Sequence, residues 1–186
     1  MLPFRLFRPD PVAAAAERLR FAALAQARRP AFFLAWGMPD SLDGRFETLC
    51  LHVFLVLRRL QAEGATARPL AQALLDATVA DLDRMLRELG VGDLGVARRI
   101  RAMGEGLMGR IAAYDAALGA ADEAALGAAL RRNLWGTLRT PAEPAPAALA
   151  AACRYLREAT AALAGQSLDS LRDDGPSFPP IPDAGP

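Results

Sequence analysis

The chain contains no lysine, one histidine and two cysteines, and each of these shortages excludes a class of site. A zinc site needs several histidine or cysteine ligands at close spacing, whereas His52 stands alone and Cys50 and Cys153 lie far apart. We therefore expect no metal and no other cofactor. Phosphate-binding loops, dinucleotide fingerprints and nucleophile elbows are also missing, so we do not expect an enzyme. No secretion signal is recognisable, and both cysteines are predicted to be buried, reduced thiols.

Valine, isoleucine and threonine are scarce while alanine, leucine and arginine dominate, which favours helices over strands. The predicted fold class is all-α, a single compact bundle of about six helices. A leader is expected over residues 1–9, the helical domain over 10–172 and an extended, proline-rich tail over 173–186. The predicted helices cover residues 11–29, 43–64, 69–89, 93–118, 122–135 and 147–164. In the tail, Phe178 and Ile181 are expected to be ordered where they find a groove.

Short polar residues mark the expected starts of the helices. The predicted N-caps are Asp10, one of Asp40, Ser41 and Asp43, then Asp93 and Asp122. The inner face of the helix over 69–89 is expected to include Leu89. Gly104, Gly106 and Gly109 lie inside the next helix, where each glycine costs about 1 kcal/mol relative to alanine. We therefore expect these glycines to allow the close approach of another backbone.

The segment DGRFETLCLHVFLVLRRL, residues 43–60, is apolar on almost every face of a helix. Its main stripe at helical spacing consists of Phe46, Leu49, Cys50, Val53, Phe54, Leu57 and Leu60. Leu51, Leu55 and Val56 extend the apolar surface to the other faces. The apolar run is shorter than the roughly 20 residues that span a bilayer. This helix is therefore either the buried centre of a bundle or a helix that receives a hydrophobic client.

Charged residues beside the apolar stripes have two interpretations. Asp81 lies close to the apolar face of its helix, so it should pair with an arginine or line a groove, and pairing is favoured. The arginines that lie off the stripes are Arg58, Arg59, Arg98, Arg99 and Arg101. They form either an ordinary solvated face or the basic rim of an apolar groove. Such a rim suits lipid headgroups or the loops of a membrane-protein client.

Net charge and aromatic spacing argue against recognition of nucleic acid. The net charge is +1, and no ladder of aromatic residues for base stacking is interleaved with the basic clusters, so sequence-specific nucleic-acid binding is not expected. A small helical enzyme would need Asp81 and His52 in one pocket, whereas a lone histidine on an apolar helix is more often a core residue. A peripheral lipid- or quinone-binding protein is a further alternative. It is suggested by the apolar central helix and by LPFRLFR within residues 1–9.

Three segments resemble the ubiquinol–cytochrome c chaperone family in order and spacing. They lie between about residues 31 and 136 and read DGRFETLCLHVFLVLRRL, DATVADLDRMLRELGVGDLGVARRIRAMGEGLMGRIAAYDAAL and LRRNLW. The resemblance implies an all-α assembly chaperone without enzymatic activity. Such a chaperone binds newly made cytochrome b and assists biogenesis of the ubiquinol–cytochrome c reductase complex. The abundance of alanine and arginine is typical of a GC-rich bacterial coding sequence.

The resemblance also implies partners, a location and a binding surface. Newly synthesised cytochrome b is the expected partner, with a small partner protein or the ribosome exit region as further candidates. The expected location is cytoplasmic, with peripheral association and transient contact at the inner membrane. Mapped onto this sequence, the family motif implies a client-binding surface with charged and apolar members. These are Asp81, Arg84, Asp93, Arg98, Arg99 and Arg101, together with Val91, Leu94 and Met108.

Overall fold

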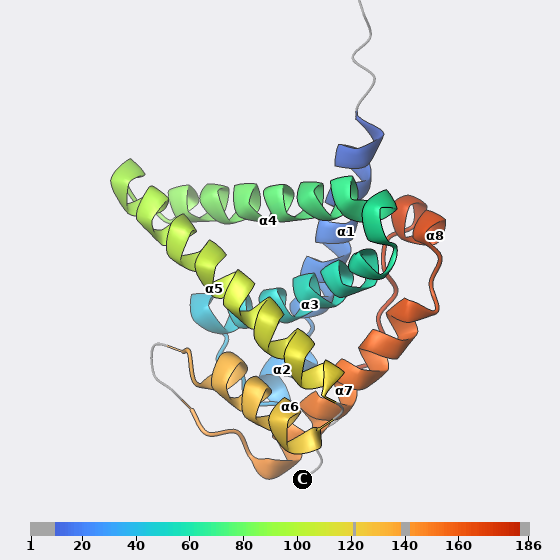
Figure 1. Cartoon of the computed structure of the whole chain (residues 1–186). Helices are drawn as coiled ribbons and strands as arrows, with labels where there is room; N and C mark the ends of the chain where they lie inside the picture. Colours follow the sequence, from blue (N-terminus) through green and yellow to red (C-terminus); the bar gives the residue numbers. More distant parts are fainter. Residues whose placement is uncertain (1–9, 121, 139–141, 183–186) are drawn as a thin grey trace, which may run out of the picture.

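A computed structural model describes residues 10–120, 122–138 and 142–182, and its regular secondary structure is entirely helical (Figure 1). The α-helices are α1 (Pro11–Ala27), α2 (Pro30–Leu34), α3 (Leu42–Ala62), α4 (Arg68–Glu88), α5 (Asp93–Gly119), α6 (Glu123–Leu130), α7 (Pro146–Ala164) and α8 (Leu168–Asp173). A 3-10 turn, η1 (Gly64–Ala67), precedes α4, and a π-helical turn, η2 (Arg131–Trp135), continues α6. The predicted all-α bundle is confirmed. The leader expected over residues 1–9 lies outside the described residues.

Three of the predicted N-caps are present. The Asp10 side chain accepts a hydrogen bond from the Val12 amide at 2.9 Å, and Ser41 accepts from Gly44 at 3.2 Å. Asp122 accepts from the Ala124 amide at 2.8 Å. These bonds satisfy amides that the first turn of a helix leaves without a partner. The cap of α5 was predicted incorrectly, because Gly92 occupies that position without a side-chain bond and Asp93 is the first helical residue.

Helix α3 lies at the centre of the bundle. It packs against α1, α4, α5 and α7, and every residue from Glu47 to Leu57 is buried. Its apolar character on all faces therefore reflects burial by surrounding helices. Both cysteines are free and buried, as predicted. None of the helices in the described ranges is long and apolar enough to cross a membrane.

Helices α4 and α5 form a hairpin whose turn projects from the body of the molecule (Figure 1). The Gly90 amide donates to the Arg87 carbonyl at 2.9 Å and the Val91 amide to the Leu86 carbonyl at 3.1 Å, while Gly90 adopts a positive φ of 77°. This pair of bonds is a Schellman motif, which closes the end of α4. Leu89 was expected in the core but is 60% exposed, because α4 ends beyond the edge of the bundle. Leu86, 1% exposed, occupies the last inward-facing position instead.

The glycines of α5 do not contact another backbone. A Cβ atom added at Gly104 or Gly109 would meet nothing within 4 Å, so the expected close helix approach is wrong at both positions. At Gly106 an added Cβ would lie 2.7 Å from the Arg110 guanidinium. Gly106 therefore leaves room for a neighbouring side chain on its own helix.

Residues 175–182, here called the C-terminal strap, return from α8 across the bundle. The Phe178 ring lies 5.2 Å from the His52 ring, and Ile181 packs against the core, so both expected contacts are present. The strap is also held by hydrogen bonds. The Gln26 amide donates to the Pro179 carbonyl at 3.3 Å, and the Trp36 indole donates to the Pro182 carbonyl at 3.2 Å. Its contacts with α1, α3 and Trp36 make the strap part of the bundle's packing.

Candidate functional site

Asp81 has a structural role between helices. Its carboxylate pairs with Arg20 of α1 at 3.1 Å and with Arg84 one turn along α4. This arrangement agrees with the pairing interpretation of a carboxylate near an apolar face. Two predicted client-binding residues, Asp81 and Arg84, are thus already engaged with each other.

The arginines at the end of α3 are also engaged within the bundle. Arg58 pairs with Asp115 of α5. Arg59 pairs with Glu63 at 2.6 Å and donates to the carbonyl of Gln166 at 2.7 and 3.1 Å. Both side chains therefore connect α3 to neighbouring segments, and neither forms part of a free basic rim.

Arg98, Arg99 and Arg101 are exposed and form no ion pair with the residues that the structure describes. They lie in the first turns of α5, close to the projecting turn. Asp93 pairs with Arg87 at 2.5 Å, and Leu94 is 91% exposed. Val91 is less open, because its side chain lies over Gly95, where a Cβ would approach it to 2.9 Å. Of the predicted surface residues, Val91, Asp93, Leu94, Arg98 and Arg101 therefore lie together near the turn of the α4–α5 hairpin. The other predicted residues lie elsewhere on the protein.

Arg99 faces a cleft of about 900 Å³ between α3, α5 and the segment after η2. We call this hollow the α3–α5 cleft. Its apolar lining comes mainly from Leu42, Phe46, Leu86, Ala102, Met103 and Leu138, and its polar lining from Ser41, Asp43, Glu47, Arg99, Arg110 and Thr137, with Pro39 at the edge. An apolar hollow with a few convergent polar groups is the usual form of a binding site.

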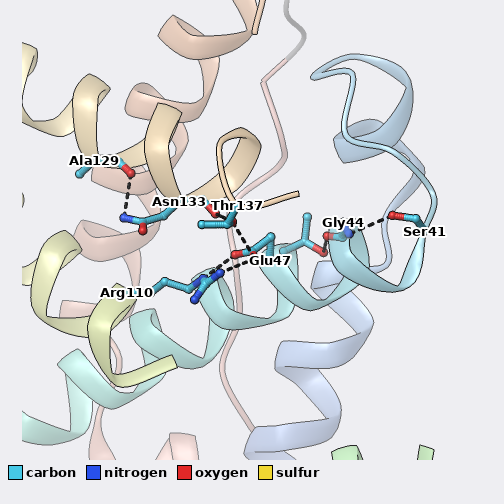
Figure 2. Close-up of polar contacts among 8 residues, drawn as sticks. Ser41, Gly44, Glu47, Arg110, Ala129, Asn133 and Thr137 are labelled. Carbon is cyan, nitrogen blue, oxygen red and sulfur yellow. Dashed lines mark hydrogen bonds and ion pairs between the residues drawn. The ribbon is translucent and has the colours of Figure 1, made fainter. Parts of the chain in front are cut away.

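A buried ion pair forms the floor of this cleft (Figure 2). The Arg110 guanidinium donates two hydrogen bonds to the Glu47 carboxylate, one of them at 2.5 Å from Nε to Oε2. The Thr137 hydroxyl contacts Glu47 Oε1 at 2.9 Å and the Asn133 carbonyl at 2.8 Å. The Arg110 guanidinium also lies 5.5 Å from the centre of the Phe46 ring. These contacts fix α3, α5 and the end of η2 relative to one another.

Burial controls the electrostatics of the pair. Glu47 is 2% exposed, and burial raises the pKa of its carboxyl group, although the bonds from Arg110 and Thr137 act in the opposite direction. The bidentate arrangement is the geometry in which arginine binds a carboxylate most strongly. Arg110 is thereby committed to Glu47, whereas Arg99, the other arginine of the cleft, has no ion-pair partner among the residues that the structure describes.

A second hollow lies on the other side of α5. It has a volume of about 330 Å³ and is bounded by α3, η1, α4 and α5. Met108, which is 55% exposed, lies at its edge beside Ile111, and Leu75 of α4 lies opposite. The predicted residues Met108 and Arg99 therefore belong to different hollows. The structure does not bring the whole predicted set into one site.

His52 is a fully buried core residue. Its Nδ1 lies 2.7 Å from the Thr48 carbonyl, which can only accept, so Nδ1 carries the proton. Its Nε2, at 2.8 Å, then accepts from the Tyr155 hydroxyl, and that oxygen accepts from Gln26 at 3.0 Å. Burial lowers the pKa of His52 to about 4. His52 and Asp81 have separate sets of partners, so they do not form the pocket required by the enzyme hypothesis.

The sequence interpretation missed Glu47, Arg110 and Thr137. Two signals for them were present. Glu47 is an acidic residue within the most apolar helix, and Arg110 lies beside the apolar stripe of α5, between Leu107 and Ile111. A buried carboxylate requires a cationic partner, so these two positions were candidates for pairing. No group of three or more histidine, cysteine or acidic residues in the described part of the chain is arranged to hold a metal ion.

An all-helical bundle with an apolar cleft and a free arginine at its wall has the architecture of a binding protein. The family model described as ubiquinol-cytochrome C chaperone matches residues 34–178, a range that includes the cleft, α7 and part of the strap. The chain therefore belongs to the ubiquinol–cytochrome c chaperone family.

Individual relatives agree with this assignment. The crystal structure of the Cbp3 homolog from Brucella abortus matches with a TM-score of 0.77 and 34% sequence identity, covering 92% of each chain. The ubiquinol-cytochrome-c reductase complex assembly factor 1 of Xenopus laevis is 28% identical over 103 residues, which are 55% of this chain and 51% of the frog protein. The mouse assembly factor 1 is 28% identical over 104 residues, or 56% of this chain and 35% of the mouse protein. The matched region thus spans about half of the frog protein and about a third of the mouse protein.

Proposed function

We propose that this protein is an assembly chaperone that binds newly made cytochrome b and assists biogenesis of the ubiquinol–cytochrome c reductase complex. Family membership supports the general role, since the family is described as a chaperone of this system and the frog and mouse relatives are named as assembly factors of the complex. We further propose that it acts on the cytoplasmic side of the inner membrane, where an unassembled membrane subunit is accessible.

The observation that carries the binding proposal is the α3–α5 cleft. Its apolar wall accepts side chains that would otherwise be exposed to water before the client is assembled, and Arg99 attracts an acidic group beside them. Burying one large aliphatic side chain contributes about 1.5 to 3 kcal/mol, and association itself costs several kcal/mol. A cleft that receives only a few such side chains therefore binds transiently, as an assembly factor must.

In this proposal, some of the predicted surface residues contact the client directly and others act indirectly. Arg99 contacts the client in the cleft, and Met108 contacts it in the smaller hollow across α5. Asp81 and Arg84 act indirectly, because their ion pairs hold α1 against α4. The family resemblance also implies a small partner protein or the ribosome exit region as a partner. Purification of this protein from cells, as in the experiment below, also tests whether either of them binds.

Filling the cleft tests the proposal. Ala102 is exposed on the cleft wall, so Ala102→Trp should obstruct binding without disturbing the core. Ala150 of α7 is exposed and lines neither hollow, so Ala150→Trp is the matched control. We expect the Ala102 variant to recover at least several-fold less cytochrome b on purification from cells, and the level of the reductase complex to fall with it. The Ala150 variant should behave as the parent protein does.

Photo-crosslinking gives a direct readout of the contact. A photoreactive residue in place of Ala102 should trap cytochrome b, whereas one in place of Ala150 should not. Equal trapping at both positions would contradict the cleft as the site. A deletion strain that keeps normal levels of the reductase complex during respiratory growth would overturn the function itself.

A further inference from the structure

Two exposed leucines lie close together in sequence at the projecting end of the α4–α5 hairpin (Figure 1). Leu89 at the end of α4 is 60% exposed and Leu94 in the first turn of α5 is 91% exposed. The Schellman bonds at Gly90 and Val91 fix the backbone between these two leucines. Both side chains are therefore held outward by a closed turn. We call the surface formed by residues 87–94 together with Arg98 and Arg101 the α4–α5 tip.

The shape of the tip decides what kind of surface it fits. The hairpin end stands away from the other helices (Figure 1), and Leu89, Leu94, Arg98 and Arg101 line neither of the two hollows described above. The α3–α5 cleft, by contrast, is concave and has its own arginine. A convex apolar point flanked by cations matches a soft, planar interface, in which apolar side chains enter the headgroup region and cations remain above it.

The charged residues near the two leucines indicate whether the interface that they fit is negatively or positively charged. Arg98 and Arg101 follow Leu94 by four and seven residues, so they lie on the same face of α5. Neither forms an ion pair with the described residues. Guanidinium groups bind phosphate through paired donors and stay charged when partly desolvated. Arg87 is already engaged with Asp83 and Asp93, and Glu88 is the exposed carboxylate that opposes the positive charge of the tip.

We propose that the α4–α5 tip is a membrane-contact element for anionic lipid. Leu89 and Leu94 enter the interface, while Arg98 and Arg101 bind headgroup phosphates. The inference stands apart from the proposed client, because it concerns lipid alone and uses a different surface from the α3–α5 cleft. It gives the chaperone a way to present that cleft next to a bilayer.

Vesicle sedimentation with the full chain tests the tip. The vesicles contain phosphatidylcholine, with or without phosphatidylglycerol, and no protein. We expect clear binding only when phosphatidylglycerol is present. Arg98→Gln combined with Arg101→Gln should lower the partition coefficient about 30-fold, since each arginine near an anionic surface contributes about fivefold. Leu94→Gln should lower it about tenfold, and Glu88→Gln should raise it a few-fold.

Matched substitutions elsewhere control for loss of an exposed leucine or arginine. Leu34 is 84% exposed at the end of α2, and Arg154 of α7 is exposed without an ion pair in the described ranges. Leu34→Gln and Arg154→Gln should bind vesicles as the parent protein does. Circular dichroism and thermal unfolding should show that all these variants fold equally, because every changed side chain is exposed.

Four outcomes would overturn the proposal. The parent protein fails to bind anionic vesicles. The control variants lose as much binding as the tip variants. Phe4→Ser combined with Phe7→Ser abolishes binding while the tip variants keep it, which would assign lipid contact to residues 1–9. Finally, the tip variants bind lipid normally but recover less cytochrome b from cells, which would make the tip a protein contact.

Discussion

Helices α3 and α5 look alike in sequence, since each carries a continuous apolar stripe at helical spacing, but they occupy opposite kinds of environment. Helix α3 is buried on all sides from Glu47 to Leu57. Helix α5 buries little more than Val96, Leu107 and Tyr114, and its other faces line two hollows and the projecting tip. The difference lies in the second face of each helix, which is apolar in α3 and contains arginine, glycine and alanine in α5. We therefore assign most of the stability to α3 and most of the binding surface to α5.

Removing the carboxylate of Glu47 should cause the largest loss of stability. Glu47→Ala leaves the Arg110 guanidinium without its partner at a site where Glu47 is 2% exposed. We expect the free energy of unfolding to fall by about 4 kcal/mol, as for other broken buried ion pairs. Urea denaturation followed by circular dichroism measures the change.

Replacement of both members of the ion pair sharpens this result. Replacing both residues by leucine removes the uncompensated charge and should cost clearly less than Glu47→Ala alone. Asp83→Ala provides the surface comparison, because its pair with Arg87 is exposed and should contribute less than about 1 kcal/mol. If Glu47→Ala cost no more than Asp83→Ala, the division of stability between α3 and α5 would be wrong.

The second prediction concerns pH and the buried histidine of α3. Folding lowers the pKa of His52 to about 4 from about 6.5 in an unfolded chain. Between these values the unfolded chain binds the proton and the folded chain does not. Stability therefore rises with pH across this window, and His52 should account for a loss of about 3 kcal/mol between pH 7 and pH 4. Denaturation series at several pH values give this contribution.

Carboxyl groups titrate in the same range, so the effect of His52 must be isolated by a variant. His52→Gln lacks the ionisable ring and should show a smaller decrease in stability between pH 7 and pH 4 than the parent. The prediction is the difference between the two proteins in how steeply the free energy of unfolding falls between pH 7 and pH 4. Equal decreases would mean that His52 becomes protonated without loss of the fold, and that the core around α3 is more open than its burial indicates.

The smallest effect on stability is expected when the glycines of α5 are replaced by alanine. A Cβ added at Gly104 or Gly109 meets nothing within 4 Å, and neither glycine has a positive φ. Gly104→Ala and Gly109→Ala should therefore each stabilise the protein by about 0.5 to 1 kcal/mol through helix propensity. The control is Gly44→Ala in α3, where the new methyl group would collide with the Pro39 carbonyl and destabilise the protein. A loss of stability at Gly104 would restore the packing role that we rejected.

The main elements of the fold were accessible from sequence because the signals were local. Asp10, Ser41 and Asp122 cap helices as their positions predict, and the apolar surface of residues 43–60 identified the central helix. Leu89 and Asp93 were misplaced for different reasons. Periodicity gives the faces of a helix but does not tell where the bundle ends, so the exposure of Leu89 was missed. Asp93 was misplaced by one position, because aspartate is favoured both as an N-cap and in the first turn of a helix.

The site was harder to predict because it depends on contacts between distant residues. Glu47 and Arg110 lie 63 positions apart, and Thr137 joins them from a third element. In the sequence, Arg58 and Arg59 cannot be told apart from Arg98 and Arg99. The structure shows ion pairs for the first two arginines and, within its described ranges, none for the second two. Family resemblance indicated a candidate region of the chain but gave no information on which side of α5 each residue faces.

The C-terminal strap has a consequence for the order in which the protein matures. Phe178 covers His52, yet it follows every helix of the bundle in the chain. During translation, the cavity around the histidine must therefore remain unsealed until the last packing residues have left the ribosome. A nascent chain at that stage has all its helices but an incomplete interior, so truncation before Phe178 should yield a protein that exchanges its core amide hydrogens much faster than the full chain.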